Sequence, residues 1–186
     1  MSAQVPAKTR LAVFLALLAL LAVTRIGHFG TVVSLPDASL AVFLLGGAWL
    51  GGWRSFVAYA TVGFGIDVFL AKSAVEAGWC LTPAYGGLVT AYGAVWLLGR
   101  VLARTPELPV VRYLGIGIAA VAVHFLIANI SFWAGSGYFG DMAAADYALS
   151  VLKYLPPYLA STALYLAIGW IGHRIVTTRL AGKQPG

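Results

Sequence analysis

The sequence is poor in charged residues and contains a single cysteine. Only 10% of its 186 residues are Asp, Glu, Lys or Arg, whereas soluble domains average about 25%. The mean hydropathy is +0.88, so most of the chain is expected to lie in lipid. Because the chain is short, we predict one transmembrane domain over residues 1–186 and no second globular domain. The lone cysteine, Cys80, excludes an intramolecular disulfide and any Cys-x-x-Cys metal or redox motif.

Two further functions are disfavoured by what the sequence does not contain. It has no phosphate-binding signature of the type GxxxxGK[ST], so we expect no ATP site of its own, and an ATP-driven step would need partner subunits. The net charge of +6 does not indicate nucleic-acid binding, because the basic residues fall between apolar segments. Basic residues in that position act as topology signals in membrane proteins.

The apolar segments predict an all-α integral membrane protein with six transmembrane helices. The run Leu11–Val23, extended to Gly27, is predicted to be a retained first helix rather than a cleaved signal peptide, with Arg25 reaching to the membrane surface. The other five predicted spans are Ala38–Trp53, Ser55–Ala71, Pro83–Leu102, Val111–Ala134 and a last one from Pro156-Pro157 to Val176. Pro83 is expected in a first helical turn, and Asp146–Leu155 is predicted to be a short surface helix.

The distribution of basic residues predicts the orientation of these six spans. Nine of the twelve Lys and Arg residues fall on the face that carries both termini, and three fall on the opposite face. Basic loops stay in the cytoplasm, so both termini are predicted to be cytoplasmic, in a bacterial cytoplasmic membrane. The loop that contains Cys80 then faces outward.

The stretch from Asp67 to Tyr85, which contains Cys80, is the first candidate for chemistry. A lone cysteine is as often a small buried hydrophobic residue as a functional one. This one, however, lies in a Gly-Trp-Cys-Leu-Thr-Pro loop between two predicted helices. Thiolates prefer soft or borderline metals. One thiolate cannot build a zinc site, but it can fill one axial position of a metal held by a macrocycle, such as haem or a cobalt corrinoid.

Asp67 and His28 are the other polar candidates near this loop. A carboxylate inside a membrane is energetically costly. Asp67 is therefore expected either to have a functional role or face a cavity, or to lie near the interface and pair with Lys72 or Arg25. His28 follows the first predicted helix and could be a metal ligand or a hydrogen-bond partner, although a lone interfacial histidine more often has no such role.

Polar and aromatic residues elsewhere have simpler explanations. His124 and Asn129 lie within the fifth predicted helix and are expected to make helix–helix contacts. The aromatic residues that gather on the outward face are typical of an interfacial belt, but they would also suit a large flat ligand. They are Phe29, Trp79, Tyr85, Phe132, Trp133, Tyr138, Phe139, Tyr147, Tyr154 and Tyr158.

Small residues spaced four apart mark two of the predicted helices. Ala12 and Ala16 in the first helix would let another helix approach closely. Gly47 and Gly51 in the second helix are expected to serve packing within the bundle.

The whole chain resembles the S-components of energy-coupling-factor transporters, and more specifically the BtuM family of solitary, S-component-like cobalamin proteins. The element that carries the resemblance is Cys80 in the loop between the third and fourth predicted helices. The resemblance implies a six-helix bundle with both termini inside and Cys80 as the axial cobalt ligand. It also implies that His28, Asp67, Tyr85 and Trp79 line the pocket. Ala12 and Ala16 resemble the motif that contacts the coupling subunit.

From this resemblance we expect binding and uptake of cobalamin (vitamin B12) and of cobinamide across the membrane. Cys80 ligation would weaken the opposite axial bond, so thiol-assisted loss of cyanide from cyanocobalamin is a further expectation. An energy-coupling module would be a partner, and nucleic acid would not. Three alternatives stay open: a carrier of a different vitamin in which Cys80 is incidental, a small thiol-dependent or haem-handling membrane enzyme, and a structural membrane protein with Cys80 buried.

Overall fold

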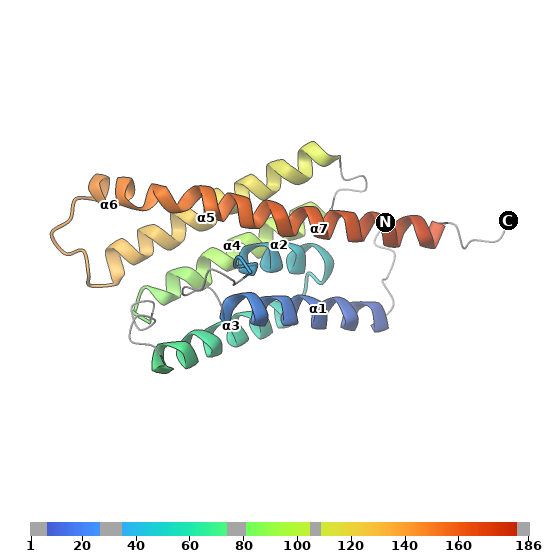
Figure 1. Ribbon diagram of the computed structural model, residues 1–186, viewed down its shortest axis with the longest axis horizontal. Helices are drawn as coiled ribbons and strands as arrows, with labels where there is room; N and C mark the ends of the chain where they lie inside the picture. The colour runs from blue at the N-terminus through green and yellow to red at the C-terminus, as the bar shows by residue number, and fades with distance from the viewer. Residues whose placement is uncertain (1–6, 27–34, 74–80, 105–108, 182–186) are drawn as a thin grey trace.

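The protein folds into an antiparallel helical bundle (Figure 1). The computed structural model describes residues 7–26, 35–73, 81–104 and 109–181. Every regular element in these ranges is a helix. The helices are α1 Ala7–Ile26, α2 Ser39–Trp49, α3 Trp53–Ser73, α4 Tyr85–Ala103, α5 Val110–Gly135, α6 Ala144–Val151, the 3-10 turn η2 Leu152–Tyr154, and α7 Leu155–Ala181.

Four of the helices within the described ranges, α1, α3, α4 and α5, are long and apolar enough to cross a membrane. Large apolar side chains lie exposed on their outer surfaces, including Phe69, Val111 and Ile118. Such exposure is unfavourable in water and normal for a surface that faces lipid. The predicted membrane-embedded all-α class is therefore supported.

The core of the bundle is α2, which lies between α1, α4 and α7 (Figure 1). Every residue from Ser39 to Gly47 is buried. With 11 residues α2 is about 16 Å long, roughly half of the hydrocarbon thickness of a bilayer. The helix ends before the predicted Trp53 because Gly51 takes a left-handed conformation (φ +64°). The Gly51 N–H donates to the Gly46 carbonyl at 3.1 Å and closes the last turn.

The other helix boundaries lie near the predicted ones, apart from α1, which begins four residues earlier at Ala7, α7, which runs five residues further to Ala181, and the start of α4. The predicted surface helix is confirmed as α6 followed by η2, and Pro156-Pro157 lies in the first turn of α7. Pro83, however, precedes α4 instead of entering its first turn. The Tyr85 N–H donates to the Thr82 carbonyl at 2.9 Å and closes a turn with Pro83 inside it, so the helix begins two residues later.

The helix ends on both sides of the segment that contains Cys80 lie at one end of the bundle, which we call the α6 end. The carboxyl ends of α3 and α5 lie there with the amino ends of α4 and α7 and with α6, and the carboxyl end of α1 points toward it from deeper in the bundle (Figure 1). The amino end of α1 and the carboxyl end of α7 lie at the opposite end. Segments on both sides of the predicted Cys80 loop therefore reach the α6 end.

Two glycines allow α2 and α4 to touch backbone to backbone. A Cβ at Gly47 would collide with the Trp96 carbonyl oxygen, and a Cβ at Gly99 would collide with the Leu44 carbonyl oxygen. The packing role predicted for Gly47 is thus confirmed. Gly51 instead ends α2 through its positive φ, so the packing role predicted for it is wrong.

We expect Gly47→Ala and Gly99→Ala each to destabilise the bundle by about 1–3 kcal/mol, because the two helices must separate to admit a methyl group. Thermal unfolding of the detergent-solubilised protein, followed by circular dichroism, measures the effect. Gly115→Ala is the matched control, since a Cβ at Gly115 has no neighbour within 4 Å. Equal unfolding temperatures for all three variants would contradict this account of the α2–α4 contact.

Candidate functional site

A buried ion pair joins α1 to α3 near the α6 end. The Arg25 guanidinium donates from Nε to Asp67 Oδ1 at 2.8 Å and from Nη2 to Asp67 Oδ2 at 2.6 Å. Each residue is only 4% exposed. Two parallel, charge-assisted hydrogen bonds of this kind fix both the distance and the relative orientation of the two side chains.

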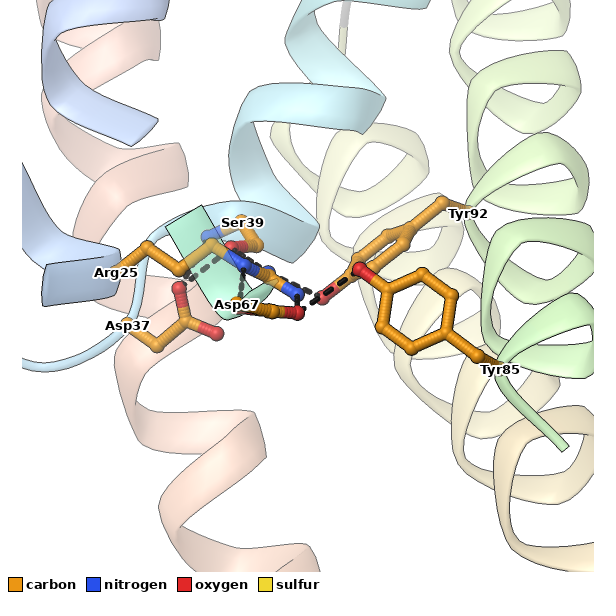
Figure 2. A network of polar contacts seen from close by, with 6 residues as sticks. All are labelled: Arg25, Asp37, Ser39, Asp67, Tyr85 and Tyr92. Carbon is orange, nitrogen blue, oxygen red and sulfur yellow. Dashed lines mark hydrogen bonds and ion pairs between the residues drawn. The ribbon is translucent and has the colours of Figure 1, made fainter. Parts of the chain in front are cut away.

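Three hydroxyl groups complete the shell around this pair (Figure 2). Arg25 Nη1 donates to Ser39 Oγ at 2.9 Å and to the Tyr92 hydroxyl at 3.3 Å, and the Tyr85 hydroxyl donates to Asp67 Oδ2 at 2.8 Å. The network therefore links α1, α2, α3 and α4. Polar groups removed from water need such partners, and here the protein supplies them.

The pair gives Asp67 one of its two predicted partners, but inside the bundle instead of at the interface, and it corrects the interpretation made for Arg25. Pairing of Asp67 with Arg25 is confirmed, while Lys72 is exposed. The predicted reach of Arg25 to the membrane surface is wrong, because its guanidinium is buried inside the bundle. The hydrogen bonds that the guanidinium would make to water at the surface are made instead to Asp67, Ser39 and Tyr92.

The segment before α2 is held against this network from three sides. Asp37 Oδ1 accepts the Ser39 N–H at 2.9 Å and the Ser39 hydroxyl at 2.6 Å. The Ala38 N–H donates to Thr24 Oγ1 at 3.2 Å, and the Tyr165 hydroxyl donates to the Pro36 carbonyl at 2.7 Å. Residues 36–39 are thereby tied to α1 and α7.

A cleft of about 290 Å³ opens beside the anchored segment. Its polar lining comes from Asp37, Tyr92, Tyr154, Tyr158 and Ser161, and its apolar lining includes Leu40 and Pro157. Tyr92 belongs to both the cleft and the ion-pair network. A concave surface of mixed apolar and polar character is the usual form of a small-molecule site.

His124 lies behind the cleft in a column of rings. Its ring centroid is 4.7 Å from that of Tyr92 and 6.0 Å from that of Tyr158, and Tyr92 in turn stacks on Phe43 at 4.4 Å. The imidazole is 2% exposed, and neither of its nitrogens has a hydrogen-bond partner within the described ranges. The predicted helix–helix contact of His124 is therefore made by ring packing between α4 and α7.

A larger groove of about 460 Å³ lies between α5 and the α6–α7 segment, but its lining is almost wholly apolar. Asn129, Tyr147 and Trp133 line it, and their polar atoms are already used. The Tyr147 hydroxyl donates to Asn129 Oδ1 at 3.1 Å, Asn129 Nδ2 donates to the Phe125 carbonyl, and Trp133 Nε1 donates to the Met142 carbonyl. This groove suits hydrocarbon chains. The hydrogen bond between Tyr147 and Asn129 confirms Asn129 as a link between α5 and α6.

The sequence-predicted site residues divide into two groups. Asp67 and Tyr85 are brought together by a direct hydrogen bond. Cys80, Trp79 and His28 lie outside the described residues. Ala12 and Ala16 lie on the exposed side of α1, where a partner helix could reach them. Within the described ranges no group of three or more His, Cys, Asp or Glu residues could hold a metal ion.

Sequence reasoning missed Asp37, Ser39 and Tyr92 as parts of the site. A local signal existed for the first two, since an Asp two residues before a Ser at the start of an apolar run is typical of a helix cap. No such signal marks Tyr92, which becomes a site residue only through the packing of α4 against α2.

The chain belongs to the family described as "Family of unknown function (DUF6580)", whose model matches residues 6–182. A search of curated proteins found no match to the chain.

We expect Arg25→Met or Asp67→Leu alone to cost about 3–5 kcal/mol, because each leaves an unpaired charge inside the bundle. The double variant removes both charges and should be more stable than either single variant. Unfolding free energies from denaturant titrations in detergent micelles test this. Arg54→Met is the control, since Arg54 is exposed. Additive losses in the double variant would show that the pair is not coupled.

Proposed function

We propose that this protein is a membrane carrier of the S-component type that binds cobalamin at the α6 end of its bundle. The observation that carries the proposal is the hydrogen bond between Asp67 and Tyr85. These two residues lie on the helices before and after the segment that contains Cys80. The same ion-pair network thus anchors the chain on both sides of the predicted cobalt ligand.

The charge distribution supports the proposed orientation. Lys8 and Arg10 at the start of α1, Arg54 at the start of α3, and Arg100 near the end of α4 lie at the end of the bundle opposite α6. Basic residues favour the cytoplasmic side. If the chain crosses the membrane six times, with short α2 making one crossing together with the non-helical segment before it, both termini are cytoplasmic and the α6 end faces outward, where a solute would arrive.

The proposed chemistry is a ligand exchange at the cobalt of the substrate. The Cys80 thiol loses its proton to water, and its sulfur donates an electron pair to cobalt on the face vacated by the nucleotide base. Cobinamide, which lacks that base, should bind as well. Strong sulfur donation weakens the opposite bond, so cyanide leaves with its electron pair as cyanide ion. No oxidant or reductant is needed.

The exposed side of α1 supports a partner contact. Ala12 and Ala16 lie there with Leu11 and Leu15. Small residues in such a row permit close helix–helix approach. We therefore include the coupling subunit of an energy-coupling module among the proposed partners. Without such a module, the bundle would transport its solute by reorienting alone.

The cleft favours a second candidate function, in which Cys80 is incidental and the protein carries a different vitamin or small solute. The cleft is formed by Asp37, Tyr92, Tyr154, Tyr158 and Ser161 together with apolar residues, all within the described ranges. It can therefore hold a compact ligand without any contribution from a thiol.

The absorbance spectrum of purified protein incubated with cyanocobalamin, after removal of free ligand, separates these two functions. A retained corrinoid spectrum that is shifted from the free form and lost in Cys80→Ala is expected. Its physical cause is direct cobalt–sulfur ligation. Equal retention of an unshifted spectrum by both proteins would contradict thiolate ligation, and no retained colour in either would favour the different solute.

Cyanide release is expected to depend on the same thiolate. Wild-type protein should convert bound cyanocobalamin to a cyanide-free form, followed by the spectral change and by cyanide assay. Cys80→Ser should slow this conversion at least about tenfold, since a hydroxyl is a harder and weaker donor to a soft metal centre. Conversion by Cys80→Ser at the wild-type rate would disprove thiol-assisted decyanation.

A further inference from the structure

The apolar groove between α5 and the α6–α7 segment is a space that the protein does not fill. Its volume is about 460 Å³, whereas one water molecule takes up about 30 Å³ of the liquid. Packed proteins leave few voids larger than a water molecule, because side chains beside a void lose dispersion contacts. Apolar spaces of this kind do not hold ordered water. The groove therefore calls for an apolar occupant.

The groove is long and follows one face of α5. Its wall on α5 runs from Ile118 to Trp133, and its wall on the α6–α7 segment runs from Ala144 to Leu159. Each wall spans 15 residue steps, or about 22 Å at the rise of an α-helix. One leaflet of the hydrocarbon core is about 15 Å thick. An acyl chain of one leaflet can therefore lie along the groove over its full length.

The groove opens onto the surface that faces lipid. Ile118, Leu126 and Ile130 line the groove and are 59–61% exposed. They belong to the outer surface of α5, where exposed apolar side chains are normal only against lipid. The groove is thus continuous with the interface between the protein and the bilayer, and lipid is the apolar medium that can enter it.

Within the described ranges, the polar side chains that line the groove are already hydrogen-bonded. The Tyr147 hydroxyl donates to Asn129 Oδ1, and Trp133 Nε1 donates to the Met142 carbonyl. A ligand that carried polar groups into the groove would leave them without such partners, which is costly. The occupant is therefore a hydrocarbon chain whose polar head stays outside the groove.

We infer that the groove holds one acyl chain of a phospholipid from the leaflet at the α6 end. Trp133 lies two residues before the end of α5, whereas Ile118 lies near the middle of that helix, so the head of the lipid is at the α6 end. The chain completes a contact that the protein leaves open, since Tyr147 is the one buried residue of α6. This inference goes beyond the proposed function, because it requires neither Cys80 nor a corrinoid.

Close packing decides how tightly such a chain is held. A chain that moves from the bilayer into the groove exchanges one apolar environment for another, so contacts along the chain supply the affinity. A larger side chain inside the groove should therefore exclude the lipid. Ala122→Phe and Ala119→Phe make a matched pair: both alanines are exposed on α5, and of the two only Ala122 lines the groove.

Native mass spectrometry of the delipidated protein, titrated with dioleoyl phosphatidylethanolamine in detergent, counts the bound lipids. Wild type and Ala119→Phe should bind the first phospholipid at least about fivefold more tightly than Ala122→Phe, because the added ring occupies the space that the chain needs. Hydrogen exchange then locates the lipid. Its addition should slow exchange of the α6 amides at least about threefold in wild type, because α6 gains contacts, and should leave Ala122→Phe unchanged.

A wild-type protein that binds no phospholipid would overturn the inference, and that result does not require any variant to fold. Equal affinities of Ala122→Phe and Ala119→Phe, or unchanged exchange of α6 in wild type, would overturn it as well. Dimers that exclude the lipid would do the same, since they would assign the groove to a second copy of the chain. None of these results bears on the proposed cobalamin function, which the cyanocobalamin spectrum tests separately.

Discussion

The ion pair between Arg25 and Asp67 is the interaction on which the α6 end of the bundle depends. It connects α1 to α3 directly, and through Ser39, Tyr85 and Tyr92 it reaches α2 and α4. A buried ion pair contributes little net stability compared with apolar packing, but losing one partner is expensive. Its main effect here is geometric, because two parallel bonds allow only one arrangement of the helices that they join.

The short length of α2 explains how polar groups reach this depth. Pro36 contacts Tyr165, which lies ten residues, or about 15 Å, inside α7. The chain therefore enters the bundle as a non-helical segment before α2 begins. Its backbone groups need partners at that depth, and Thr24 and Tyr165 provide them. A full-length second helix would have filled this space, and the cleft beside Asp37 would not exist.

Much of the fold could be predicted from apolar runs, because length and composition decide which segments can lie in lipid. The pairing of Asp67 with Arg25 could be anticipated as one of two interpretations, since few charges are available inside the bundle. The burial of Arg25 could not, because a snorkelling arginine and a buried one have the same local sequence. Tyr92 and the cleft depend on how α2 packs against α4 through Gly47 and Gly99, and no local pattern encodes that distance.

The arrangement of charges bears on how the proposed carrier would move its solute. Among the described residues, the buried carboxylate of Asp67 is tied to Arg25 and Tyr85, and the half-buried carboxylate of Asp37, just before α2, is tied through one oxygen to Ser39. Groups held in this way suit a rigid binding end better than a chain of proton exchanges. Motion of the whole bundle is then the simpler route. The exposed side of α1, with Ala12 and Ala16, lies away from the network, so a partner could act on that side without disturbing the site.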